Sequence, residues 1–258
     1  MENRITKLFA RKKKNILSVF YTAGFPTLQD TVSIGIHLEA AGVDMIEIGI
    51  PFSDPIADGP TIQESNKIAL NQGMNVELLL NQVAELRAKL KMPIVLMGYL
   101  NPVMQYGVEK FCTKASAAGV DGLILPDLPI DEYVKHYKEL MESLNLSISF
   151  LISPTTPDAR IKKIDALSSG FIYAVSSSST TGAKKEFSKE QQDYFRKLQS
   201  FKLTHPFLIG FGISNHKTYS QACEYGAGAI VGSSFITCLK ESKNQQEDIH
   251  QFVQSLIS

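Results

Sequence analysis

The feature that most constrains this chain is a repeated alternation of short apolar runs with longer amphipathic segments. Eight runs of strand length recur from residue 16 onward. Most of them are apolar throughout, a pattern typical of parallel strands that are covered on both faces. We predict strands at residues 16–21, 45–49, 94–99, 122–125, 148–152, 171–175, 207–210 and 229–232.

Between these runs, apolar residues are spaced as on one face of a helix. Two such rows are residues 79, 83, 86 and 90 and residues 133, 137, 140 and 144. Predicted helices end at glycines such as Gly42 and Gly226, where a left-handed cap needs no side chain.

Eight strand–helix units in 258 residues predict an α/β fold, a closed (β/α)8 TIM barrel that forms a single domain over residues 1–258. A short N-terminal helix is expected before the first strand. An extra short helix, at residues 235–239, is expected after the eighth. A doubly wound open sheet with the same order of elements is the alternative fold.

Composition excludes several classes of function. The chain has 26 basic and 26 acidic residues, and a formal net charge of zero argues against binding nucleic acid or an anionic membrane. No apolar run approaches the roughly 18 residues that cross a bilayer, and residues 15–21 lack a signal-peptide cleavage site. Three widely separated cysteines indicate neither a disulfide framework nor a thiolate zinc site. We therefore predict a cytoplasmic protein with free thiols.

Two carboxylates are placed where a barrel carries its chemistry, at the carboxyl ends of strands and in the following loops. Glu47 lies inside an apolar strand, where desolvation raises the pKa of a carboxyl group. Asp58 follows in residues 50–60, a loop stiffened by three prolines directly above the same strand. A structural ion pair is the alternative role for Glu47, and turn formation is the alternative for Asp58.

The second candidate site is rich in glycine. Residues 210–214 (GFGIS) close the seventh predicted strand, and residues 232–234 (GSS) close the eighth. Barrels commonly bind phosphate at this corner through backbone N–H groups, and residues 180–182 could fold over it. Tight turns without a ligand are the alternative. No histidine ends a predicted strand, so neither a metal centre nor a Ser-His-Asp triad is predicted.

Residues 47–63, EIGIPFSDPIADGPTIQ, closely resemble the signature of the tryptophan synthase alpha subunit family. The similarity continues through YLNP at residues 99–102, LPDLP at 125–129, and the two glycine-rich turns, so it extends over essentially the whole chain. The sixth loop departs from the family, which often has Ser-Arg-Ser-Gly-Val-Thr-Gly where residues 176–182 read SSSSTTG. This difference bears on loop closure and leaves both carboxylates in place.

The resemblance implies a lyase that cleaves indole-3-glycerol phosphate to indole and glyceraldehyde 3-phosphate in tryptophan biosynthesis, without metal or organic cofactor. It makes Glu47 the general acid and base, and Asp58 the carboxylate that faces the indole nitrogen. It places two side chains beside the substrate and backbone donors around its phosphate: Phe20, Tyr173, Thr181, Gly182, Gly212, Gly232 and Ser233. The implied partner is a pyridoxal-phosphate-dependent beta subunit, in an alpha2beta2 heterotetramer.

Other interpretations use the same residues. A free-standing indole-3-glycerol phosphate lyase would have both carboxylates and need no partner. A non-catalytic subunit that only activates a partner would not need to retain Glu47 and Asp58. A different phosphate-binding barrel enzyme would normally need a lysine, a histidine or a metal ligand at its strand ends. If a beta subunit binds, the proline-rich loop is its expected docking surface, with Phe52 and Ile56 exposed at the rim.

Overall fold

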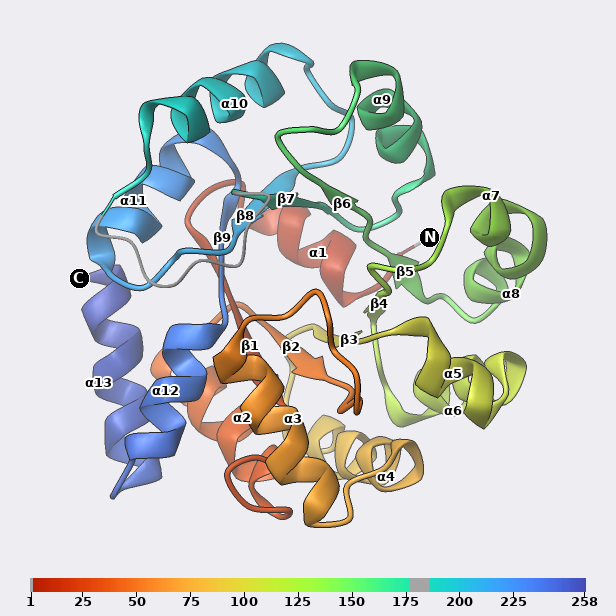
Figure 1. Cartoon of the computed structure of the whole chain (residues 1–258), viewed down its shortest axis with the longest axis vertical. Helices are drawn as coiled ribbons and strands as arrows, with labels where there is room; N and C mark the ends of the chain where they lie inside the picture. Colours follow the sequence, from red (N-terminus) through yellow and green to blue (C-terminus); the bar gives the residue numbers. More distant parts are fainter. Residues whose placement is uncertain (1, 177–185) are drawn as a thin grey trace.

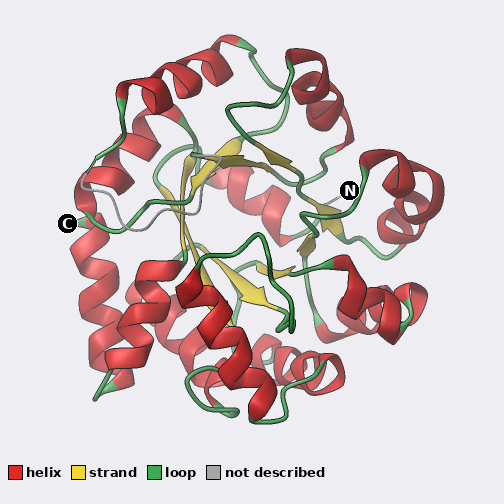
Figure 2. Ribbon diagram, in the orientation of Figure 1, coloured by secondary structure: helices red, strands yellow, loops and turns green. Residues whose placement is uncertain are grey.

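The protein is represented by a computed structural model that describes residues 2–176 and 186–258. In this part of the chain, parallel strands alternate with helices that surround them (Figure 1, Figure 2). The strands are β1 (Ile16–Thr22), β2 (Met45–Gly49), β3 (Ile94–Met97), β4 (Gly122–Ile124), β5 (Ser147–Ile148), β6 (Leu151–Ile152), β7 (Ile172–Val175), β8 (Phe207–Gly210) and β9 (Gly228–Val231).

The helices begin before the first strand and end after the last. They are α1 (Arg4–Arg11), α2 (Asp30–Ala41), α3 (Pro60–Asn71), α4 (Val76–Arg87), α5 (Leu100–Tyr106), α6 (Val108–Ala118), α7 (Ile130–Glu132), the π-helix η1 (Tyr133–Tyr137), α8 (Lys138–Ser143), α9 (Asp158–Leu167), α10 (Lys189–Ser200), α11 (His216–Tyr225), α12 (Ser233–Glu241) and α13 (Gln245–Ile257). None of these helices is long and apolar enough to cross a membrane.

The sheet closes on itself through one interrupted strand. Its order runs from β5 through β4, β3, β2, β1, β9, β8 and β7 to β6. The two end strands, β5 and β6, are halves of the run that was predicted as a single fifth strand. The Ser149 amide donates to Leu123 O on one side (3.1 Å), and the Tyr173 amide donates to Phe150 O on the other (3.0 Å). The predicted (β/α)8 barrel is therefore confirmed, with a break in its fifth strand.

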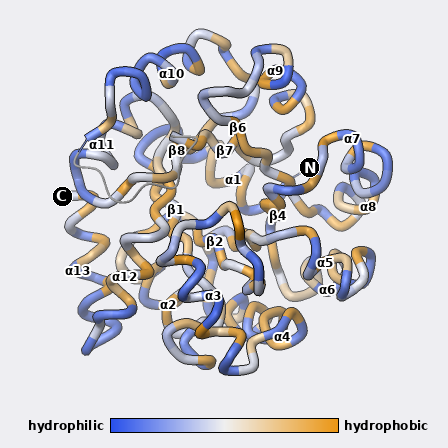
Figure 3. Tube along the Cα trace, in the orientation of Figure 1, coloured by the Kyte–Doolittle hydropathy of each residue, from blue (hydrophilic) through white to orange (hydrophobic). Residues whose placement is uncertain are grey.

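Buried apolar side chains form two layers, because successive residues of a strand point to opposite faces. Leu17 and Val19 of β1 pack outward beneath the helices. Ile16 belongs to the inner layer, with Met45 and Val95 from neighbouring strands. Figure 3 shows mainly hydrophobic residues along the strands and a mixture of residues along the surrounding helices. Any polar side chain on the inner face therefore lies in apolar surroundings.

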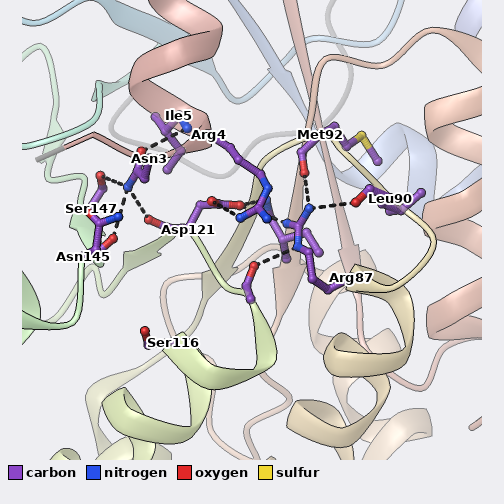
Figure 4. Close-up of polar contacts among 12 residues, drawn as sticks. Asn3, Arg4, Ile5, Arg87, Leu90, Met92, Ser116, Asp121, Asn145 and Ser147 are labelled. Atoms are coloured by element: carbon purple, nitrogen blue, oxygen red, sulfur yellow. Dashed lines mark hydrogen bonds and ion pairs between the residues drawn. The ribbon is translucent and has the colours of Figure 1, made fainter.

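Helix α1 closes the amino-terminal end of the barrel, and in the view of Figure 1 it crosses the barrel's opening. Its Ile5 and Phe9 side chains join the inner apolar layer. Asp121, just before β4, accepts hydrogen bonds from Arg4 (3.1 Å) and from Arg87 of α4 (3.0 Å). Figure 4 shows this network, in which the Asn3 side chain also donates to the Asp121 carbonyl oxygen (2.9 Å). With this end shut, access to the inner layer is from the opposite end.

A left-handed glycine cap was predicted at the ends of two helices, at Gly42 and at Gly226, and the structure has one of them. Gly42 has φ 98° and is a left-handed cap of α2, as predicted. The prediction for Gly226 was wrong, because this residue has φ −105°. A glycine is needed there for close approach, since a Cβ atom would lie 2.9 Å from the carbonyl oxygen of Phe207.

Candidate active site

A cavity of about 190 Å³ opens at the carboxyl ends of the strands. It is lined by side chains from β1, β3, β7 and β9, by the loops after β2, β8 and β9, and by the beginnings of α3 and α12. Six of the predicted site residues share this lining: Phe20, Asp58, Tyr173, Gly212, Gly232 and Ser233. Thr181 and Gly182 lie outside the described residues.

Glu47 is a fully buried carboxyl group on the inner face of β2. The Ser18 hydroxyl donates to its Oε1 atom (2.7 Å), whereas Oε2 has no hydrogen-bond partner among the described residues. Burial raises the pKa of Glu47 to about 8, and the bond from Ser18 partly opposes this rise. None of the ion pairs formed within residues 2–176 and 186–258 includes Glu47, which removes support for the structural ion pair. Glu47 is therefore protonated at neutral pH.

Asp58 is a half-buried carboxyl group at the rim of the cavity. Burial raises its pKa to about 6, and a hydrogen bond from Tyr99 to Oδ2 (3.2 Å) partly opposes the rise. The Gln63 side chain fixes the backbone at this point by donating to the Asp58 carbonyl oxygen (2.8 Å). At neutral pH the chain thus has an ionised carboxylate at Asp58 and a protonated carboxyl group at Glu47.

The loop that carries Asp58 is held from below by Tyr99. The Ala57 amide donates to the Tyr99 hydroxyl (3.0 Å), and the rings of Phe52 and Tyr99 are 5.2 Å apart. Phe52 is consequently half-buried, so its predicted exposure was wrong. Ile56 is 89% exposed, as predicted. Tyr99, which was predicted to end a strand and was not predicted as a site residue, is the N-cap of α5.

Aromatic side chains line the inner part of the cavity. Tyr173 of β7 meets Phe211 edge to face, with ring centroids 6.2 Å apart. Gly210 makes room for it, because a Cβ atom there would lie 2.3 Å from the Tyr173 hydroxyl oxygen. Burial raises the pKa of Tyr173 well above its ordinary value, and the charges of Glu47 and Asp58 raise it further. The Tyr173 hydroxyl, which is influenced by both carboxyl groups, therefore keeps its proton.

Backbone groups form the other end of the cavity. Gly212 has φ +75°, a left-handed conformation that favours glycine. Gly232 is the N-cap of α12 and supplies no side-chain cap. The first intrahelical bond runs from the Phe235 amide to Gly232 O (2.9 Å), so the amide groups of Ser233 and Ser234 precede it. The Ser234 hydroxyl ties this turn to the loop after β8 by donating to Ile213 O (3.2 Å). No lysine or arginine is among the described lining residues, so backbone N–H groups and the hydroxyl groups of lining serines and threonines are the donors available to an anion.

The remaining polar residues offer no obvious metal site in the described ranges. No group of three or more His, Cys, Asp or Glu side chains gathers there. Four histidines lie in helices and His205 lies in the loop before β8, so that, as predicted, no histidine ends a strand. The three cysteines are free thiols, also as predicted.

The protein-family model described as "Tryptophan synthase alpha chain" matches residues 6–257 of this chain. The chain belongs to the tryptophan synthase alpha chain family. It is 50% identical to the tryptophan synthase alpha chain of Parabacteroides distasonis, over 98% of this chain and 99% of that one. Identity to the alpha chain of Flavobacterium johnsoniae is also 50%, over 97% and 98% of the two chains.

Solved tryptophan synthase structures have the same fold. The alpha subunit from Legionella pneumophila str. Paris superimposes with a TM-score of 0.90 at 32% identity, covering 100% of this chain and 98% of that one. A tryptophan synthase structure from Mycobacterium tuberculosis gives a TM-score of 0.90 at 30% identity, with coverage of 100% and 98%. Membership in the tryptophan synthase alpha chain family gives this chain the role of a lyase subunit in tryptophan biosynthesis.

Proposed function

We propose that the chain cleaves indole-3-glycerol phosphate to indole and glyceraldehyde 3-phosphate. The observation that carries the proposal is a single cavity with an aromatic end, a carboxylate at its rim and a backbone-amide end. The substrate has the matching parts in one molecule: an indole ring, a ring N–H group and a phosphate.

Glu47 is proposed as the general acid and base. Cleavage requires a proton on indole C3, which makes the ring an electron sink, and removal of a proton from the adjacent side-chain hydroxyl. The carbon–carbon bond then breaks, its electron pair returns to the ring, and the hydroxyl carbon becomes the aldehyde. A carboxyl group with a pKa of about 8 can give the first proton at neutral pH and collect the second as carboxylate.

Asp58 is proposed to stabilise the ring as it becomes positively charged. With a pKa of about 6 it is ionised at neutral pH, so it can accept a hydrogen bond from the ring nitrogen. Tyr99, which donates to the same carboxylate, holds it at the rim of the cavity. Phe20 and Tyr173 would pack against the ring from the inner part of the lining.

The backbone N–H groups of Gly212, Gly232 and Ser233 are proposed to hold the phosphate, and Thr181 and Gly182 to complete the site from the sixth loop. An anion fixed at this corner orients the reacting end toward Glu47, which lowers the entropic part of the barrier. The proposed chemistry is acid–base catalysis, and it needs neither a metal nor an organic cofactor.

A beta subunit is the proposed partner, in an alpha2beta2 assembly located in the cytoplasm. Ile56 supports a docking surface on the loop that carries Asp58, because this large apolar side chain is 89% exposed. Docking there would act directly on the position of the catalytic carboxylate.

The test is an assay of purified chain with indole-3-glycerol phosphate, with and without the cognate beta subunit, in which released indole is measured. We expect indole in both cases and a faster rate with the partner. An equal rate despite complex formation would identify a free-standing lyase. No indole under either condition, from a folded chain that binds its partner, would identify a non-catalytic activating subunit and overturn the proposal.

A further inference from the structure

Ser18 is a fully buried serine inside the barrel. On β1, Ile16, Ser18 and Phe20 are alternate residues, so their side chains share the inner face of the barrel. In the pairing of β1 with β2, Ser18 is opposite Met45 and Phe20 is opposite Glu47. Ser18 and Glu47 are therefore diagonal neighbours on adjacent strands, one residue pair below the floor of the cavity.

The hydroxyl group of Ser18 and one carboxyl oxygen of Glu47 are hydrogen-bond partners in the barrel interior. The hydroxyl donates to Oε1 at 2.7 Å, and apolar side chains such as Ile16, Met45 and Ile230 make up the neighbouring inner layer. A buried hydroxyl without a partner is destabilising, so its presence in this layer calls for a partner such as Glu47. Without Ser18, neither carboxyl oxygen would have a hydrogen bond from the described residues.

We infer that Ser18 is a positioning residue for the reaction: its hydroxyl group fixes Oε1 of Glu47 and leaves Oε2 as the oxygen that transfers protons. The inference rests on the proposed role of Glu47 as acid and base. Neither Ser18 nor Glu47 is among the lining residues of the cavity, and Ser18 acts through the Glu47 side chain.

A hydroxyl group suits this task better than a cation. It can donate to Oε1 whether Oε2 is ionised or carries the proton, so the contact survives both protonation states. A lysine or arginine at the same place would favour the ionised form strongly and would remove the acid. Ser18 therefore orients Glu47 while burial keeps its pKa near neutrality.

The other groups that face Glu47 do not replace this contact. Val95 of β3 and Phe20 of β1 are apolar strand neighbours. Tyr173 of β7 and Asp58 of the loop after β2 are the titratable groups nearby, and the charge of each carboxylate raises the pKa of Tyr173. Of these neighbours, Ser18 is the one that lowers the pKa of Glu47.

The test is Ser18→Ala in the chain with its partner, together with a carbon-13 NMR titration of the Glu47 carboxyl group, assigned by its loss in Glu47→Gln. We expect the pKa of Glu47 and the alkaline limb of kcat to rise by about one pH unit. Turnover at neutral pH should fall about tenfold through lost orientation, with KM within about twofold. The titration needs no substrate, so it decides the inference even if no indole is released.

If Ser18→Ala does not fold, the variants Ser18→Thr and Ser18→Val are compared instead. Threonine and valine have nearly the same shape and differ in the hydroxyl group. The threonine variant should retain the wild-type pKa and the valine variant should not. Thr22→Val is the matched control, since it removes another buried hydroxyl of β1, bonded to Ser65. A Glu47 pKa unchanged by loss of the hydroxyl, or raised equally in Thr22→Val, would overturn the inference.

Discussion

At the scale of single residues, the site depends on two carboxyl groups whose pKa values are raised by different amounts. Glu47 is fully buried and has a pKa of about 8, whereas Asp58 is half-buried and has a pKa of about 6. Between these values one group holds a proton and the other is an anion. Two identical functional groups thereby take different roles through their surroundings alone.

The pH dependence of kcat/KM should follow from these two groups. We expect a bell-shaped profile, because Asp58 gains a proton below about pH 6 and Glu47 loses its proton above about pH 8. Asp58→Asn should lower the rate severely and abolish the acidic limb. An acidic limb that persists unchanged in that variant would assign it to a different group.

Glu47→Gln should separate catalysis from stability. Turnover should fall by roughly 10² to 10⁴, because the amide cannot transfer the proton. The free energy of unfolding of the Glu47→Gln variant should exceed that of the wild type at alkaline pH. Glu47 binds a proton in the folded chain up to about pH 8 but in the unfolded chain only up to about 4.5. Wild-type stability should therefore fall, by about 1.4 kcal/mol per pH unit, as pH rises through this window.

Urea titrations at pH 5 and pH 9 measure the difference, and indole release measures turnover. Equal losses of stability with pH in both proteins would mean that Glu47 is not buried as a neutral acid.

At the scale of elements, the proposed phosphate site depends on how α12 begins. Gly232 has φ −126°, and a Cβ atom there would come no closer than 3.6 Å to Phe20, so a side chain can be accommodated. Gly212 has φ +75°, where any substitution would strain the backbone. Position 232 is therefore the one at which charge can be tested without damaging the fold.

Gly232→Asp should weaken binding of indole-3-glycerol phosphate strongly, because it places a carboxylate beside the substrate's phosphate. Gly232→Asn has nearly the same shape without the charge and should be affected much less. KM for the phosphorylated substrate, compared with the rate on a substrate that lacks phosphate, measures the effect. Equal losses for the two variants would indicate a steric cause and count against an anion site.

Periodicity predicted the barrel because each strand and helix buries one continuous apolar pattern. It did not predict the break at Ser149 and Phe150, or the π-helical turn Tyr133–Tyr137, since both keep the same apolar spacing. Glu47 and Asp58 were recognisable because a charge in an apolar strand and a proline-framed loop are unusual. Ser18 was not, because a serine in a strand does not reveal its partner on the neighbouring strand.

At the scale of the whole molecule, the two ends of the barrel have separate tasks. The carboxyl end carries the cavity, whereas the amino end is sealed by α1 and by the ion pairs of Asp121. Asp121 also accepts a hydrogen bond from the Ile94 amide (2.9 Å), so one carboxylate joins α1, α4 and β3. Stability and catalysis should therefore respond to different substitutions.

Asp121→Ala should destabilise the chain by about 3 to 5 kcal/mol, because it leaves the mostly buried Arg87 guanidinium without its counter-charge. Chemical denaturation measures the loss, and turnover per folded molecule should remain near that of the wild type. Glu85→Gln, which removes the exposed pair with Lys89, is the control and should leave stability nearly unchanged. A small effect of Asp121→Ala would show that α1 is held by its apolar contacts alone.

The beta subunit should raise the rate of indole release at least tenfold, if a partner shifts the loop of Asp58 toward a competent state. Ile56→Ser should reduce this rise more than the basal rate, because the side chain is exposed in the isolated chain and away from the proposed chemistry. Titration of the beta subunit measures both quantities. A full rise with the serine variant would place the docking surface elsewhere.

The contacts that hold α1 at the amino end are made by groups that are synthesised long after α1 itself. The carbonyl oxygen of Asp121 and the hydroxyl of Ser147 hold Asn3, yet they lie 118 and 144 residues later in the chain. A ribosome therefore releases α1 long before it releases the groups that receive it. Helix α1 therefore cannot make these contacts until translation has passed Ser147, when more than half of the chain has been made.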